Sequence, residues 1–207
     1  PTRRLPPQQD LDEWVRQLAQ AGFTTLVVEA GTVQAQGRKQ EPNGQPPQQA
    51  GVYFQTHWAP TIRDVVGQLV PVAHRHGLRV FSAVALWRMN WLEPQLGWTE
   101  QTYDRAKRQL VASERLDLFH PAFQEYLIGL LSDLAVGGVD GVFFRTDVPL
   151  ESTEGFSPYG FKGFERDFGV KLDPATLFVS ADLGTSGKNQ RDAAPEFWRW
   201  VGWRARE

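Results

Sequence analysis

The chain has 207 residues, of which 41% are hydrophobic and 12% aromatic, and its formal net charge at pH 7 is −2. This apolar content suits one sizeable core, so we expect a single domain over residues 1–207. Charges of both signs are interspersed, which argues against nucleic acid and against an anionic membrane surface as partners. The absence of cysteine excludes disulfides, thiolate nucleophiles and cysteine-based zinc sites.

Three helix-then-strand units follow one another along the chain. In each unit, apolar residues at helical spacing end at a glycine, and a short apolar run follows directly. The runs are rich in β-branched residues, so we expect strands that are buried on both faces of a parallel sheet with right-handed crossovers. The predicted helix and strand ranges are 10–22 and 23–31, 60–77 and 78–86, and 121–138 and 139–147.

Two further segments differ from this pattern. Residues 32–51 are rich in Gln, Gly and Pro, which predicts an exposed loop. The stretch after Asp147 reads as irregular, and residues 195–204 predict an amphipathic helix with no strand after it. The sequence therefore predicts three firm strands.

The loops favour one architecture. Loops that follow the strands are long and carry the unusual residues, whereas those before the strands are short, as in a (β/α)₈ barrel. We expect an α/β fold with a TIM-barrel-like (β/α) domain, partial because three strands are fewer than a barrel needs, and corresponding to the N-terminal portion of the barrel. A doubly wound sheet is the alternative, but the glycine-rich phosphate loop of that fold is absent.

Polar and aromatic side chains gather at the three predicted strand ends, which should converge in such a fold. Two carboxyls flanking a sugar are the usual requirement for glycoside hydrolysis, so Asp147 and Glu29 are the candidate catalytic residues. Flat aromatic rings can stack on the C–H faces of a sugar, and neighbouring amide or guanidinium groups can bond to its hydroxyls. The candidate substrate-binding residues are Tyr53, Trp87, Arg88, Asn90, Trp91 and Arg145.

Each assignment has a structural alternative. Asp147 could cap a helix or pair with Arg145, Glu29 could bond to the loop of a neighbouring strand, and any single tryptophan could be a core residue. Asp140 precedes the third strand and is predicted to be a turn residue at the opposite end, outside the site. His57, His74, His76 and His120 lack metal-ligand spacing, so we expect no metal and no cofactor.

The chain resembles the C-terminal glycoside-hydrolase domain of PgaB-type exopolysaccharide proteins. The similarity runs in order through Thr24-Thr-Leu-Val-Val-Glu-Ala, Gly51-Val-Tyr-Phe and Val84-Ala-Leu-Trp-Arg-Met-Asn-Trp. It is sharpest at Leu116-Asp-Leu-Phe-His-Pro-Ala-Phe and Asp140-Gly-Val-Phe-Phe-Arg-Thr-Asp-Val-Pro-Leu. Glu165, Asp167 and Phe168 are similar to a segment of related hypothetical glycosyl hydrolases.

The resemblance implies a (β/α) barrel that hydrolyses partially deacetylated poly-β-1,6-N-acetylglucosamine, in the periplasm or at the bacterial cell envelope. The family's His-Asp-Asp is Arg145-Thr146-Asp147 here, so one of two adjacent carboxylates is missing. A non-catalytic polysaccharide-binding or export module is therefore the alternative, and a scaffold domain with a linker or docking segment over 33–50 is a third reading. No apolar run approaches the roughly 20 residues of a membrane helix, so we expect no membrane span, and we expect any targeting signal upstream. The sequence leaves the oligomeric state open.

Overall fold

A computed structural model describes residues 8–32, 50–93, 96–145, 151–178 and 195–204. Contacts between Cα atoms divide the chain into two compact units. Unit 1 comprises Pro1–Leu96 and Gln124–Asp147, and unit 2 comprises Gly97–Phe123 and Val148–Glu207. The expectation of one domain over 1–207 stays a prediction, and each unit is described by itself.

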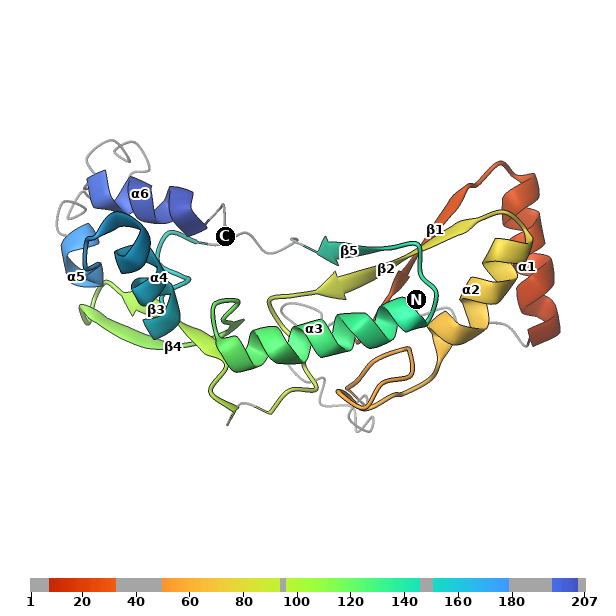
Figure 1. The fold of residues 1–207 in the computed structure, drawn as a ribbon, viewed down its shortest axis with the longest axis horizontal. Coiled ribbons are helices and arrows are strands. Elements are labelled where there is room, and N and C mark those ends of the chain that lie inside the picture. Colours follow the sequence, from red (N-terminus) through yellow and green to blue (C-terminus); the bar gives the residue numbers. More distant parts are fainter. Residues whose placement is uncertain (1–7, 33–49, 94–95, 146–150, 179–194, 205–207) are drawn as a thin grey trace. The chain divides into compact units, whose positions relative to one another are not determined.

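Unit 1 contains a parallel sheet of three strands in the order β1-β2-β5 (Figure 1). A helix precedes each strand in the chain, which confirms the three helix-then-strand units. The elements are α1 (Gln8–Gln20), β1 (Thr25–Glu29), α2 (Val65–Arg75), β2 (Arg79–Ala85), α3 (Pro121–Val136) and β5 (Gly141–Arg145). The fold is α/β, and the sheets of the described residues are small and form no closed barrel.

The register of the sheet decides which side chains share a face. Glu29, Ala83 and Phe143 are aligned, as are Ala85 and Arg145, so their side chains lie on one face, which we call the Glu29 face. The opposite face carries three buried side chains of the central strand β2, those of Val80, Ser82 and Val84.

The prediction that all strands are buried on both faces is wrong for the outer strands. Val27 of β1 is 64% exposed and Phe143 of β5 is 57% exposed, both on the Glu29 face. Each of these strands has a neighbour on one side only within this sheet. An apolar run thus predicted the strands and their parallel pairing, but not the burial of their faces.

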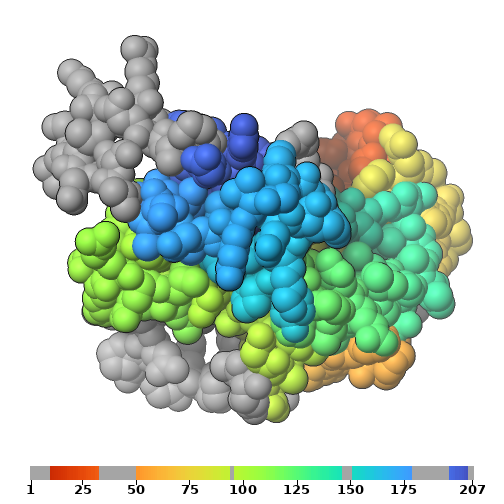
Figure 2. Space-filling model, turned by 60° about the vertical axis from the view of Figure 1, so that its left-hand side comes forward, coloured from red at the N-terminus to blue at the C-terminus, as the bar shows by residue number. Residues whose placement is uncertain are grey.

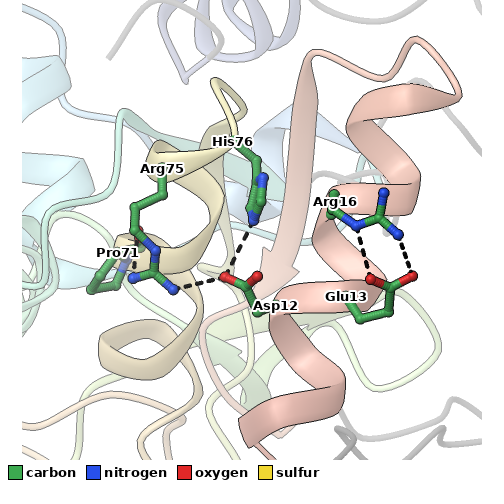
Figure 3. Close-up of polar contacts among 6 residues, drawn as sticks. All are labelled: Asp12, Glu13, Arg16, Pro71, Arg75 and His76. Carbon is green, nitrogen blue, oxygen red and sulfur yellow. Dashed lines mark hydrogen bonds and ion pairs between the residues drawn. The ribbon is translucent and has the colours of Figure 1, made fainter.

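A polar contact joins α1 to α2 (Figure 3). Asp12 accepts a hydrogen bond from Arg75 at 2.8 Å, and its carboxylate lies 3.2 Å from Nε2 of His76. The side chain of Arg75, followed by that of His76, holds the pKa of Asp12 below its ordinary value. The contact therefore ties the end of α2 to α1.

Asp140 has the structural role expected of it. It lies directly before β5, and its Oδ2 accepts hydrogen bonds from the backbone N–H of Val80 at 2.7 Å and from His74 Nε2 at 2.9 Å. The Val80 bond and then the His74 bond lower the pKa of Asp140. One carboxylate therefore links α2, β2 and the start of β5 at the amino end of the sheet.

Unit 2 is built on an antiparallel hairpin and three helices: β3 (Thr99–Asp104), β4 (Gln109–Leu116), α4 (Pro158–Phe168), α5 (Pro174–Leu177) and α6 (Pro195–Arg204). Its core is largely aromatic, with Phe156, Phe164 and Trp200 fully buried. Trp200 stacks on Phe156 at 5.6 Å between ring centroids. Figure 2 shows the surface of α4 and α5, in blue, lying directly on that of the hairpin, in green.

One prediction is corrected in unit 2, the hairpin was not predicted, and helix 195–204 is confirmed. The hairpin adds two strands to the three that the sequence predicts. Its turn contains Arg108 with a φ of 54°, where a glycine would have signalled a turn. The stretch after Asp147 is not irregular throughout, since Ser157 caps α4 and Gly169, with a φ of 66°, ends it.

Among the described residues, no helix combines the length and the hydropathy needed to cross a membrane.

One glycine of α3 is required by packing. A Cβ atom added at Gly129 would overlap the indole ring of Trp58. The same ring lies edge-on to Tyr126, with centroids 5.9 Å apart. The helix therefore approaches Trp58 as closely as a backbone without a side chain allows.

We expect Gly129→Ala to lower the free energy of unfolding by about 1–3 kcal/mol, because the added methyl group must displace Trp58. Gly202 of α6 is the matched control, since nothing lies within 4 Å of a Cβ placed there. Gly202→Ala should be neutral or stabilising by up to about 1 kcal/mol, as helix propensity alone dictates. Urea denaturation measures both, and equal effects of the two changes would contradict the packing role of Gly129.

Candidate functional site

The carboxyl ends of β1 and β5 are joined by an ion pair. Nη1 of Arg145 donates to Oε1 of Glu29 at 2.9 Å. The side chain of Glu29 is 45% exposed and that of Arg145 is 25% exposed. Two of the predicted site residues, 116 positions apart in sequence, are thus brought into direct contact.

Small residues of the central strand make this contact possible. Glu29 is aligned with Ala83, and Arg145 with Ala85, on the Glu29 face. The strand β2 lies between β1 and β5. Both alanines also line the pocket beside Glu29.

The second oxygen of the Glu29 carboxylate is buried and has no hydrogen-bond partner in the described part of the chain. Glu29 also lines a small pocket with residues from the end of β2, from α3 and from the segment after β1. The pocket has a volume of about 10 Å³, room for about one water molecule. A sugar ring is far larger than this pocket.

Asn90 is anchored by a residue that the sequence reasoning missed. Thr32 Oγ1 donates to Oδ1 of Asn90 at 2.7 Å, and the same hydroxyl accepts from the N–H of Gly51 at 3.1 Å. Thr32 is placed by a backbone bond from its N–H to the carbonyl of Gly51 at 2.8 Å. The segment after β1 thus orients the amide that follows β2.

A close packing contact and a hydrogen bond hold the side chain of Trp91 in place. A Cβ at Gly31 would lie 2.8 Å from the Trp91 ring, and Trp91 Nε1 donates to the hydroxyl of Tyr126 at 2.8 Å. Tyr126 is 6% exposed, and burial raises the pKa of its phenol. Tyr126 lies within the predicted helix 121–138, and helical periodicity does not reveal a partner for its hydroxyl.

The other predicted residues are less closely linked to the ion pair. Trp87 and Arg88 are half-buried in the segment after β2. Tyr53 is half-buried too, and its backbone N–H donates to the carbonyl of Ala30 at 2.8 Å while its carbonyl accepts from the first residues of α2. Asp147, the first candidate for catalysis, lies outside the described residues.

The histidines do not gather around a metal. His57 lies 3.5 Å from Asp133, His74 bonds to Asp140 and His76 contacts Asp12, each with a different carboxylate. Within the described ranges, no group of three or more histidine, aspartate or glutamate side chains could hold a metal ion.

The Trp91–Tyr126 hydrogen bond predicts that Trp91 contributes to the stability of the fold. Tyr126→Phe leaves the indole N–H without its partner, which should cost about 1–3 kcal/mol of unfolding free energy. Trp91→Phe keeps an aromatic face, and the double variant should recover part of the Tyr126→Phe loss, with a coupling energy of about 1 kcal/mol. Urea denaturation of the four proteins checks the cycle, and strictly additive losses would contradict the bond.

No family model matches the chain, and no curated protein matches it. Among solved structures, the chain is similar to the crystal structure of a hypothetical protein from Ruminiclostridium thermocellum ATCC 27405. The TM-score is 0.50, the sequence identity is 12%, and the match covers 73% of this chain and 76% of that one. This similarity concerns the fold alone.

Proposed function

We propose that the chain is a glycoside hydrolase that acts on a bacterial amino-sugar exopolysaccharide, partially deacetylated poly-β-1,6-N-acetylglucosamine, in the periplasm or at the cell envelope. The observation that carries the proposal is the convergence of Glu29 and Arg145 at the carboxyl ends of parallel strands. Sites of (β/α) barrels are built at this end of the sheet. The resemblance to PgaB-type domains supports the substrate class.

We also propose that the sheet is part of a TIM-barrel-like fold. The three strands are parallel, each follows a helix, and the Glu29 face exposes apolar side chains at Val27 and Phe143. In a barrel this face is the interior, where layers of side chains fill the space. In such a barrel, Val27 and Phe143 would lie in the interior.

In this proposal the two candidate carboxyls differ in role. Asp147 acts as the acid or the nucleophile, and Glu29 orients a sugar hydroxyl together with Arg145. The guanidinium of Arg145 holds one oxygen of Glu29 in place. Trp87, Trp91 and Tyr53 would stack on sugar rings, with Asn90 and Arg88 contributing hydrogen bonds.

One observation favours the alternative of a polysaccharide-binding or export module without catalysis. The carboxylate of Glu29 is already engaged by Arg145, and Thr146 stands where the similar family has a second aspartate. A site in which a guanidinium holds one of the two carboxyls can bind a glycan without completing a two-carboxyl hydrolysis.

A product assay separates the two functions. The purified chain is incubated with partially deacetylated poly-β-1,6-glucosamine, and new reducing ends and released oligosaccharides are measured. We expect Asp147→Asn to reduce the rate by at least about 100-fold, because general acid catalysis contributes this much or more. Glu125→Gln, at an exposed position of α3, is the matched control and should keep full activity.

Equal rates for Asp147→Asn and the unaltered chain would remove Asp147 from the mechanism. Saturable binding without any product, lost in Trp87→Ala, would instead establish the binding module. A folded chain with neither product nor binding would reject both functions.

A further inference from the structure

Two consecutive residues after β1 contact two consecutive residues after β2. A Cβ atom at Gly31 would lie 2.8 Å from the ring of Trp91, and the hydroxyl of Thr32 donates to Oδ1 of Asn90 at 2.7 Å. Asn90 and Trp91 are candidate substrate-binding residues, whereas Gly31 and Thr32 have no part in the function proposed above. The segment after β1 therefore contacts both candidate residues of the segment after β2.

Thr32 is itself held by the backbone of Gly51. Its N–H donates to the Gly51 carbonyl at 2.8 Å, and its hydroxyl oxygen accepts from the Gly51 N–H at 3.1 Å. The hydroxyl has one proton to donate, and it lies 3.2 Å from the Gly51 carbonyl but only 2.7 Å from Oδ1 of Asn90. Because the carbonyl already accepts from the N–H of Thr32, the hydroxyl proton is assigned to Asn90.

This bond fixes which end of the Asn90 amide is engaged by the protein. An asparagine amide accepts at its oxygen and carries two donors on its nitrogen. The oxygen of Asn90 accepts from Thr32, and the nitrogen has no hydrogen-bond partner in the part of the chain that the structure describes. Asn90 is exposed. The two donors are therefore left for water or for a ligand.

A fixed amide distinguishes only ligand groups that cannot exchange the roles of donor and acceptor. A sugar hydroxyl can donate and accept, so either end of an amide can bond to it. A carbonyl oxygen only accepts, and an ammonium group only donates. An acetylated amino-sugar unit carries an acetamido carbonyl, whereas a deacetylated unit carries an ammonium group in its place.

We infer that Thr32 is a positioning residue that presents the nitrogen of the Asn90 amide to the ligand, and that Asn90 thereby recognises the acetamido carbonyl of an acetylated unit. The inference rests on the proposed function. To offer its oxygen to an ammonium group, the amide would have to turn and lose the bond from Thr32. An acetylated unit is therefore preferred at Asn90, by about fivefold for one hydrogen bond.

Binding of two β-1,6-linked glucosamine pentasaccharides to the intact chain tests the inference. One is fully acetylated and the other fully deacetylated, and titration calorimetry gives both affinities. The ratio of the two affinities is compared between variants of equal charge, so the general attraction of the charged ligand cancels. Thr32→Val keeps the shape but not the hydroxyl, and it should shift the ratio about fivefold toward the deacetylated ligand. Thr32→Ser restores the hydroxyl and should keep the original ratio.

A second variant shows whether Thr32 acts through the amide. Asn90→Ala, at an exposed position, should shift the ratio as Thr32→Val does, and the double variant should show no further shift. Thr102→Val, in β3 of unit 2, is the matched control and should leave the ratio unchanged.

Three outcomes would overturn the inference. An unchanged ratio in Thr32→Val or in Asn90→Ala, or a further shift in the double variant, would reject it while the unaltered chain still binds the ligands and the proposed function stands. Failure of the folded, unaltered chain to bind either pentasaccharide would reject the proposed function, and the inference with it.

Discussion

The parallel pairing of β2 with a strand on each side is the constraint on which unit 1 depends. Backbone bonds fix the register of β1 and β5 against β2, and this register places Glu29 and Arg145 on one face. The two small residues of β2 leave the space in which the ion pair forms. A shift of either outer strand by one residue would send its charged side chain to the opposite face, because side chains alternate along a strand.

The two units differ in how far their charged side chains are exposed to water. The carboxylates that connect elements in unit 1 remain partly exposed, as with Asp140 and its partner His74. Water can therefore solvate these charges, and each ion pair alone contributes little to the stability of the fold. Unit 2 buries Glu100 and Arg115 almost completely. A buried charge is stable only with its partners present, so the segments that supply those partners depend on one another.

The elements of unit 1 could be read from the sequence because strong local signals agree with the tertiary structure. Apolar periodicity and glycine stops located the helices and strands, and the repeated helix-then-strand order indicated parallel strands. The hairpin of unit 2 gave no such signal, since its turn uses Arg108 in a left-handed conformation and its strands carry many polar residues. Long-range partners, such as Tyr126 for Trp91, could not be predicted either, because a contact between residues far apart in the sequence is not visible in the local pattern around either residue. Within the candidate site, the pairing of Glu29 with Arg145 appeared only once the register was known.

The order of the two units along the chain has a consequence for synthesis and for fragments. Unit 1 is interrupted by residues 97–123 and is completed only when β5 has been made. Unit 2 is interrupted in turn by 124–147 and depends on α6 near the end of the sequence. During synthesis, the hairpin therefore leaves the ribosome before β5, the third strand of the sheet in unit 1. A cut at Leu96, or anywhere between the hairpin and α6, separates partners within a unit, so neither unit can be obtained as one continuous fragment.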